Sequence, residues 1–294
     1  MATLRDIKRR ITSVTNTQQI TSAMRMISAA KLNRAQLAAK SAMPYAAKLR
    51  EMVTTLASGL TGNDHPLLIQ EAEGKPLVIL FVSDRGLCGG FNSNLNRMVY
   101  KQLAADPSLA GAELIIFGRS GNDFFKRRGV AIRAAHANLR EVERRQALRQ
   151  VIDDAIKGFL GGEISRVILA YNHFNNAISQ EPVMRPLLPI AQEATPKEQA
   201  DETDARKIED QVGIFEPDRE TILNTLLPRY LENQGLLAHL STEAGEHGAR
   251  MVAMEGATKN AGEMISRLTL QYNRARQASI TSELIEIISG AESL

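Results

Sequence analysis

The chain has 294 residues, of which 44% are hydrophobic, 23% are charged and 4% are aromatic, and it contains no Trp. This is an ordinary globular composition, but so few aromatics favour an extended helical body over one large core. The single cysteine, Cys88, excludes an internal disulfide and a cysteine-rich metal site, and it fits a reducing compartment. No stretch approaches the ~20 consecutive apolar residues of a membrane span, and no apolar segment follows the basic N-terminus. We therefore expect a cytosolic protein without a secretory signal.

The charge is unevenly distributed, although the net formal charge is only +3. The first 50 residues hold ten Lys and Arg residues against Asp6 alone, a net charge of +9. Such a segment is expected to meet an acidic surface or a phosphate backbone, and a solvated face is an equally open interpretation.

The N-terminal segment is predicted to be a long helix. Thr3 and Asp6 form a capping-box-like pair at its start. An apolar stripe follows, over Leu4, Ile7, Ile11, Val14, Ile20, Met24, Ile27 and Leu37. Most side chains between 12 and 47 are small or polar, which allows a second helix to approach closely. Pro44 is expected to bend or break the helix, because it removes one backbone hydrogen bond.

The C-terminal segment is predicted to be its partner in an antiparallel coiled coil. Apolar or small residues recur there at alternating steps of three and four: Met251, Met254, Thr258, Ala261, Ile265, Leu268, Tyr272, Ala275 and Ser279. A helix over 229–289 would reach roughly 90 Å, longer than a globular domain, so it must project. Pro228, Gly235, Gly245 and Gly248 predict an irregular stretch over 228–248.

The middle of the chain alternates strand and helix patterns, which predicts a Rossmann-like α/β domain with a mostly parallel sheet. Strands are expected at 76–83, 113–118 and 166–171, helices at 92–105, 121–128 and 141–160, and a Pro-interrupted edge strand at 177–189. The predicted organisation is an N-terminal coiled-coil helix (1–60), the α/β domain (75–190), an acidic loop or linker (191–215) and a C-terminal coiled-coil helix (216–294).

A glycine-rich turn at 83–92 lies between a strand and a helix, where phosphates bind in Rossmann-like folds. It matches neither nucleotide-binding glycine motif, so a structural turn is favoured over a phosphate site. Cys88 has no neighbouring base in the sequence and is better explained as a small buried residue. The five histidines lack metal-ligand spacing. We therefore expect no catalytic residue, no metal and no cofactor.

Four motifs resemble the gamma subunit of F-type ATP synthase, of the bacterial type. They are TSVTNTQQITSAM at 12–24, DRGLCGG at 84–90, ARMVAM at 249–254 and ITSELIEIISGAES at 280–293, and they span almost the whole chain. The resemblance implies a non-catalytic central-stalk rotor that couples proton flow through the c ring to ATP synthesis. Its coiled coil would turn inside the ring of alpha and beta subunits, and its α/β domain would contact the epsilon subunit and the c ring. The complex would lie at the cytoplasmic face of the cell membrane, with this chain peripheral.

The resemblance also implies roles for particular residues. By this resemblance, the residues expected to contact other subunits and to affect coupling are Met24, Arg250, Arg276, Gln277, Thr281, Glu283 and Glu286. Glu216 is expected to lie at the foot of the stalk. Simple packing or solvation stays open as the alternative role of each residue. A rotating shaft is also expected to show small and polar residues on its outer face. The single cysteine excludes the dithiol insertion of chloroplast gamma subunits. A basic coiled-coil nucleic-acid-binding protein and a nucleotide-dependent enzyme remain the alternatives.

Overall fold

The computed structural model describes residues 3–58, 66–68, 74–190 and 219–292. The chain divides into two compact units, one formed by residues 31–249 and the other by residues 1–30 together with 250–294. The predicted acidic linker and the residues that flank it, 191–218, lie outside the described residues.

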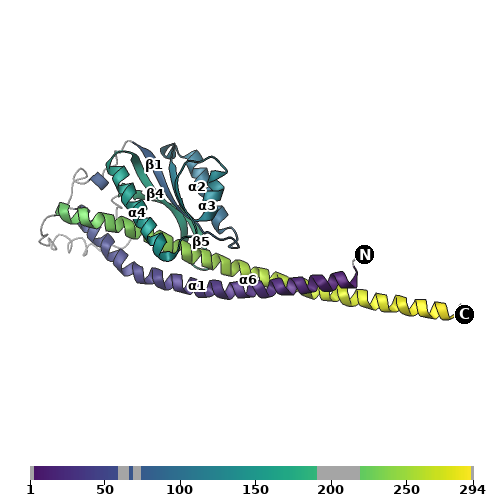
Figure 1. Ribbon diagram of the computed structural model, residues 1–294. Helices are drawn as coiled ribbons and strands as arrows, with labels where there is room; N and C mark the ends of the chain where they lie inside the picture. The colour runs from purple at the N-terminus through teal and green to yellow at the C-terminus, as the bar shows by residue number, and fades with distance from the viewer. Residues whose placement is uncertain (1–2, 59–65, 69–73, 191–218, 293–294) are drawn as a thin grey trace. The chain divides into compact units, whose positions relative to one another are not determined.

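The larger unit is built on a five-stranded sheet (Figure 1). Its strands are β1 (Lys75–Phe81), β2 (Glu113–Phe117), β3 (Ile132–His136), β4 (Ile164–Phe174) and β5 (Gln180–Leu188), in the spatial order β3-β2-β1-β4-β5. The four strands from β3 to β4 are parallel, and β5 joins β4 antiparallel at the edge. The mostly parallel sheet and the antiparallel edge strand that the sequence predicted are therefore present.

Helices cover both faces of this sheet. The first face packs on α2 (Phe91–Ala105) and α3 (Arg119–Lys126), the second on α4 (Glu141–Leu160) (Figure 1). β1 supplies alternate residues to the two cores, Val78 and Leu80 to the first and Leu77 and Ile79 to the second. This is why its apolar run is continuous, as expected for a strand buried on both faces. Short 3-10 turns at Pro66–Leu68 and Pro107–Leu109 complete the described elements.

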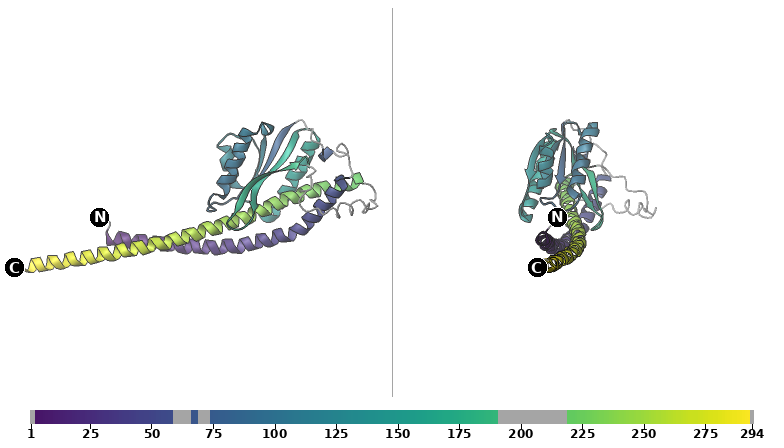
Figure 2. Two further views of the ribbon diagram at one scale, coloured as in Figure 1. Left: turned by 180° about the vertical axis from the view of Figure 1, so that it is seen from behind. Right: turned by 90° about the vertical axis from the view of Figure 1, so that its right-hand side faces the viewer.

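Two long helices run through both units, α1 (Leu4–Ser58) and α6 (Arg219–Glu292). In the larger unit α6 buries Leu223, Leu227 and Leu231 in the core that also holds α4. In the smaller unit the N-terminal part of α1 lies beside α6 in both views of Figure 2.

Pro44 was expected to bend or break the helix, and a break is excluded because α1 continues through it. The predicted irregular stretch over 228–248 is wrong, because α6 continues through Pro228. Beyond Pro44, α1 buries Ala46 and Leu49, and this packing offsets the lost hydrogen bond.

Three glycines of α6, Gly235, Gly245 and Gly248, are sites of close approach. A Cβ atom at Gly235 would lie 3.2 Å from Leu148 of α4, and one at Gly245 would lie 2.8 Å from the Phe91 ring. A Cβ atom at Gly248 would lie 3.1 Å from the Ala177 backbone. The loss of helix propensity, ~1 kcal/mol per glycine, is therefore offset by close packing.

Candidate functional site

The smaller unit is an antiparallel helix pair. The hydroxyl oxygens of Thr21 and Thr258 lie 2.8 Å apart and share a hydrogen bond. One turn away, a Cβ atom at Gly262 would lie 3.1 Å from the side-chain nitrogen Nε2 of Gln18. Thr21 therefore faces Thr258 and Gln18 faces Gly262, so residue numbers decrease along α1 where they increase along α6. The two helices run in opposite directions, as the sequence predicted.

Small and polar residues fill much of this seam. Thr21 and Ser28 of α1 are buried, as are Met254 and Ala261 of α6. The Thr21 hydroxyl also reaches the Gln18 carbonyl, 3.0 Å away, and the Thr258 hydroxyl reaches the Met254 carbonyl, 2.8 Å away. Buried hydroxyls therefore have partners within and between the helices, as the interior of a protein requires. A polar layer of this kind fixes the register of a coiled coil at some cost in stability.

Two of the predicted contact residues lie along this paired part. Met24 is partly buried. Arg250 is only 7% exposed, so its side chain is held within the chain itself and not on its outer face. Burying a charged side chain is costly without polar partners, and Arg250 does take part in polar or electrostatic interactions.

The C-terminal end of α6 extends past its partner. Since Thr21 lies opposite Thr258, Leu4 lies opposite a position near 275, and α6 continues to Glu292. The predicted residues Arg276, Gln277, Thr281 and Glu283 are all exposed on this end. The Thr281 hydroxyl donates to the Gln277 carbonyl at 2.9 Å, and the Ser279 hydroxyl donates to Glu283 Oε1 at 3.2 Å.

The two remaining predicted residues cannot be placed in the same detail. Glu286 belongs to α6, but its side chain is outside the described residues. Glu216, the residue expected at the foot of the stalk, lies outside them altogether.

The end of α6 also carries large apolar side chains that sequence reasoning missed. Ile280, Leu284, Ile285 and Ile288 are 48–58% exposed. Ile20, Met26 and Ile27 of α1 are similarly exposed. The expectation of a small and polar outer face is therefore wrong. The sequence does contain the pattern that indicates this surface. Leu284, Ile285 and Ile288 follow Ile280 by four, five and eight residues, a spacing that places the four side chains along one side of a helix.

The glycine-rich turn is held by its own side chains. Leu87 and Gly89 have positive φ angles of 63° and 59°. The Asn92 side chain accepts from the Ser83 amide at 3.0 Å and donates to the Ser83 hydroxyl at 2.6 Å. It also lies 3.5 Å from the sulfur of Cys88, which is buried. The Ser83 hydroxyl, the Asn92 amide and the Arg85 carbonyl lie within 4.0 Å of this sulfur.

A group of charged residues joins this turn to the helices of the larger unit. Asp84 Oδ1 accepts from the Arg119 amide at 3.0 Å, and Asp84 Oδ2 lies 3.3 Å from the Arg144 guanidinium of α4. Nearby on α6, burial lowers the pKa of His239 to about 3, so this imidazole is neutral near pH 7. Burial also raises the pKa of Glu243, whose Oε2 lies 3.9 Å from His239 Nε2. The arrangement ties α4 and α6 to the sheet and offers no nucleophile.

The described residues contain no group of three His, Cys, Asp or Glu side chains that could hold a metal ion. None of the described helices is long and apolar enough to cross a membrane.

Comparison with solved structures shows the same fold. The central-stalk/c-ring structure of the Tetrahymena thermophila mitochondrial ATP synthase contains a chain that is 25% identical, with a TM-score of 0.60. The match covers 81% of this chain and 99% of that one. A rotor chain of the Euglena gracilis mitochondrial ATP synthase is 16% identical, with a TM-score of 0.64, over 94% of this chain and 98% of that one.

Comparison with known sequences covers the chain from end to end. A family profile described as ATP synthase matches residues 3–294. The ATP synthase gamma chain of Trichlorobacter lovleyi is 46% identical over 100% of this chain and 99% of its own length. That of Pelotomaculum thermopropionicum is 44% identical over 100% of both chains. None of these comparisons supports the nucleic-acid-binding alternative. The resemblance found in the four motifs is confirmed, and the chain belongs to the ATP synthase gamma chain family.

Proposed function

We propose that this chain is the central-stalk rotor subunit of an F-type ATP synthase, and that it couples proton flow through the c ring to ATP synthesis. The observation that carries the proposal is the full-length match to ATP synthase gamma chains at 44–46% identity. The antiparallel helix pair, with α6 continuing past α1, supplies a stiff element that can enter a ring of subunits.

In this role the subunit does no chemistry of its own. Its partners are the alpha and beta subunits of the catalytic ring, the epsilon subunit and the c ring, and it sits peripherally at the cytoplasmic face of the membrane. The Cys88 thiol is buried beside Asn92 of its own turn, and this burial supports a non-catalytic subunit.

The exposed end of α6 is the part that we assign to contact with the ring. Arg276 offers five donors in a fixed fork, which suits an acidic or carbonyl-rich loop of a beta subunit. Gln277, Thr281 and Glu283 add polar contacts on the same exposed segment. The exposed apolar residues from Ile280 to Ile288 would lose water on entering the ring, and this loss stabilises the assembly.

Met24 and the basic face of α1 are assigned to contact with an acidic beta loop, and Glu286 to coupling. Glu216 is assigned to the foot of the stalk. Since Arg250 is buried within the chain, its part in coupling would act through the packing of α6 and not by direct contact with the ring.

Copurification tests the proposal. A tagged form of this chain, produced in its own cells, should bring down alpha, beta, epsilon and c subunits in constant proportion. The same preparation should pump protons when supplied with ATP in membrane vesicles. Recovery of the chain without alpha and beta subunits would refute the assignment.

A further inference from the structure

The α6 helix is hydrogen-bonded to the end of β4 through one of its own side chains. The Ser241 hydroxyl accepts from the Phe174 amide at 2.8 Å and donates to the Asn172 carbonyl at 3.3 Å. Both backbone groups lie in the last three residues of β4, so they hold Ser241 between them. Hydrogen bonds weaken steeply when the donor and the acceptor are displaced from one another. Ser241 therefore fixes the position of α6 along β4.

Two buried glycines on the same face of α6, Gly245 and Gly248, follow Ser241 by four and seven residues. A Cβ atom at Gly245 would lie 2.8 Å from the Phe91 ring. One at Gly248 would lie 3.1 Å from the backbone of Ala177, in the turn between β4 and β5. Turning α6 by one residue position, about 100°, would bring a side chain into the place of a glycine. The contact therefore resists rotation of α6 about its own axis.

The hairpin of β4 and β5, against which this face of α6 lies, is itself held firmly. The two strands pair antiparallel along most of their length. In the turn, Asn176 Oδ1 accepts from the amides of Ile178 and Ser179 at 2.9 and 2.8 Å. The side-chain nitrogen of Gln180 donates to the carbonyls of Asn176 and Ala177 at 3.0 and 2.9 Å. A displacement of α6 is therefore passed on to the sheet and is not absorbed within the hairpin.

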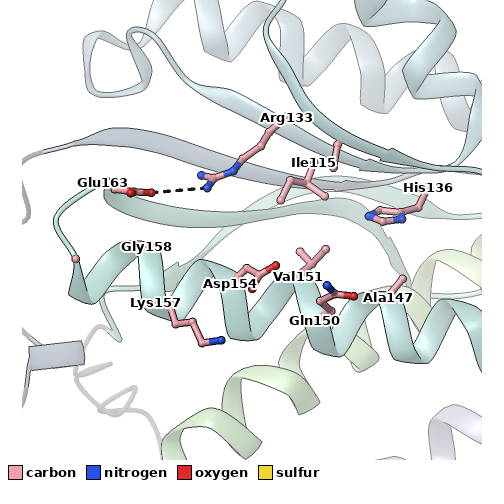
Figure 3. Close-up of a pocket in the computed structure, with 12 residues that line it drawn as sticks. Ile115, Arg133, His136, Ala147, Gln150, Val151, Asp154, Lys157, Gly158 and Glu163 are labelled. Carbon is pink, nitrogen blue, oxygen red and sulfur yellow. Dashed lines mark ion pairs between the residues drawn. The ribbon is translucent and has the colours of Figure 1, made fainter.

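The contact of α6 with α4 is less specific. It is made by apolar side chains of their shared core, whose packing is non-directional. The ion pair of Arg149 with Glu232 adds little, because it is exposed and its atoms are 3.8 Å apart. α4 is also not closely packed on the sheet along its whole length, since a groove of about 530 Å³ lies between them, lined by Ile115 and Val151 among others (Figure 3). Among the described contacts of α6 with the sheet and its helices, the contact with the hairpin is therefore the most rigid.

We propose that Ser241, Gly245 and Gly248 form a joint, the hairpin joint, that locks α6 against twisting relative to the sheet. The three are positioning residues for energy coupling: a torque in α6 enters the α/β domain at this joint. They touch no nucleotide and no ion, and they act by keeping the angle of the α/β domain equal to the angle of the helix. The inference rests on the proposed function, because only a rotating subunit carries a torque.

The angular fluctuation of a stalled rotor tests the proposal. The assembly of alpha subunits, beta subunits and this chain is fixed to a surface through its ring, and a bead on the α/β domain reports the angle without ATP. In Ser241→Ala with Gly245→Ala, two hydrogen bonds are lost and a methyl group pushes α6 away from the Phe91 ring. We expect the variance of the angle to increase roughly twofold in this double variant, because close packing no longer transmits the displacement. An unchanged variance overturns the proposal.

Three control variants separate the joint from a general loss of stability. Gly256→Ala adds the same methyl group to α6 at a place where no described atom lies within 4 Å. Thr225→Val removes a hydroxyl that bonds to the Thr221 carbonyl of the same helix. Leu114→Ala truncates a core to which α6 contributes no described residue, and it destabilises the chain without touching the joint. All three should keep the variance of the parent chain. A variance in Leu114→Ala as large as in the double variant overturns the proposal.

Hydrogen exchange of the Phe174 amide follows the hydrogen bond of Ser241 directly. In Ser241→Ala this amide should exchange roughly tenfold faster, because it loses its acceptor. Ser241→Thr keeps the hydroxyl and should keep both the slow exchange and the parent variance. If the double variant does not assemble, Ser241→Ala and Ser241→Thr decide the matter, and equal variances in these two overturn the proposal.

Rotation of the parent assembly with ATP is recorded before any variant is compared. Its absence refutes the proposed function, and the role of the joint in coupling with it. Rotation of the parent together with equal variances in all variants refutes the joint alone.

Discussion

The hydroxyl groups of Thr21 and Thr258 meet 2.8 Å apart across the pair of terminal helices, although 237 residues separate them in the sequence. This hydrogen bond lies in a layer of small and polar residues where a coiled coil usually has a dry apolar seam. It fixes which turn of α1 faces which turn of α6, and so fixes how far the end of α6 projects.

Replacing either threonine by valine should destabilise the chain by about 1 kcal/mol, because one buried hydroxyl loses its cross-helix partner. The double replacement, Thr21→Val with Thr258→Val, should cost less than the sum of the single replacements. Urea unfolding of the four proteins measures this coupling. Thr12→Val is the matched control, since the Thr12 hydroxyl is exposed and bonds only within its own helix. Additive effects in the double variant would mean that the two hydroxyls do not stabilise each other.

Met24→Lys should uncouple the motor. Beside an acidic beta loop, a new cation at this partly buried position would hold one rotor angle too strongly, by ~1–3 kcal/mol. ATP hydrolysis should persist while proton pumping per ATP falls. The measurement is the ratio of pumping to hydrolysis in membrane vesicles, with Met24→Leu as the uncharged control. An unchanged ratio in the lysine variant would remove Met24 from the contact surface.

Replacing Arg276 and Gln277 together by alanine should lower ATP turnover and coupling only in part, since the rest of the shaft still fixes the axis. Nucleotide affinity at the catalytic sites should stay near its normal value. Measuring affinity and steady-state turnover on the same preparation decides the matter. A loss of affinity as large as the loss of turnover would place these residues in a nucleotide site.

Cys88→Ala should assemble and rotate almost normally, because the buried thiol packs as a small side chain beside Ser83 and Asn92. The cost should be that of a small core truncation, about 1 kcal/mol in unfolding free energy. ATPase activity of the assembled complex is the readout. Loss of most activity with assembly intact would restore a catalytic role for the thiol.

His239 should make stability depend on pH. Burial lowers its pKa to about 3 in the folded chain, whereas the ordinary pKa of histidine in an unfolded chain is about 6.5. Between these two values the imidazole is protonated in the unfolded chain and neutral in the folded chain. The free energy of unfolding is therefore unaffected by His239 above pH 6.5. It decreases as pH falls from 6.5 toward 3, by at most ~1.4 kcal/mol per pH unit. The raised pKa of Glu243 opposes this trend, since its protonation favours the folded state.

The variant His239→Phe keeps an aromatic ring against Phe81 and removes the titrating group. The difference in unfolding free energy between this variant and the parent chain should change with pH between 6.5 and 3. A difference that stays constant over this range would contradict the assigned burial of His239.

Much of the fold followed from local patterns in the sequence. The apolar run before Ser83 became β1, and the helix predicted at 141–160 became α4 with the same bounds. β3 was missed because Ile132–His136 contains two alanines and an arginine, so it has neither an apolar run nor strict alternation. It is a strand because β2 offers it a partner, and that is a tertiary effect.

The glycines and prolines of the long helices led to wrong predictions of helix interruption for a similar reason. Helix propensity predicts interruption at Gly245, but the Phe91 ring occupies the space that a side chain would need. At the candidate site, the motifs predicted the helix pair and the exposed residues around Arg276. The burial of Arg250 and the Thr21–Thr258 contact depend on the register between two distant helices, and no local pattern specifies that register.

The central claim is that this chain turns within the complex. The direct measurement is single-molecule rotation of the alpha, beta and gamma assembly, with the ring fixed to a surface and a bead attached to the α/β domain of this chain. The account predicts rotation in one direction whenever ATP is supplied, stopping when ATP is removed. An assembly that hydrolyses ATP at a normal rate while the bead stays at a fixed angle would contradict it.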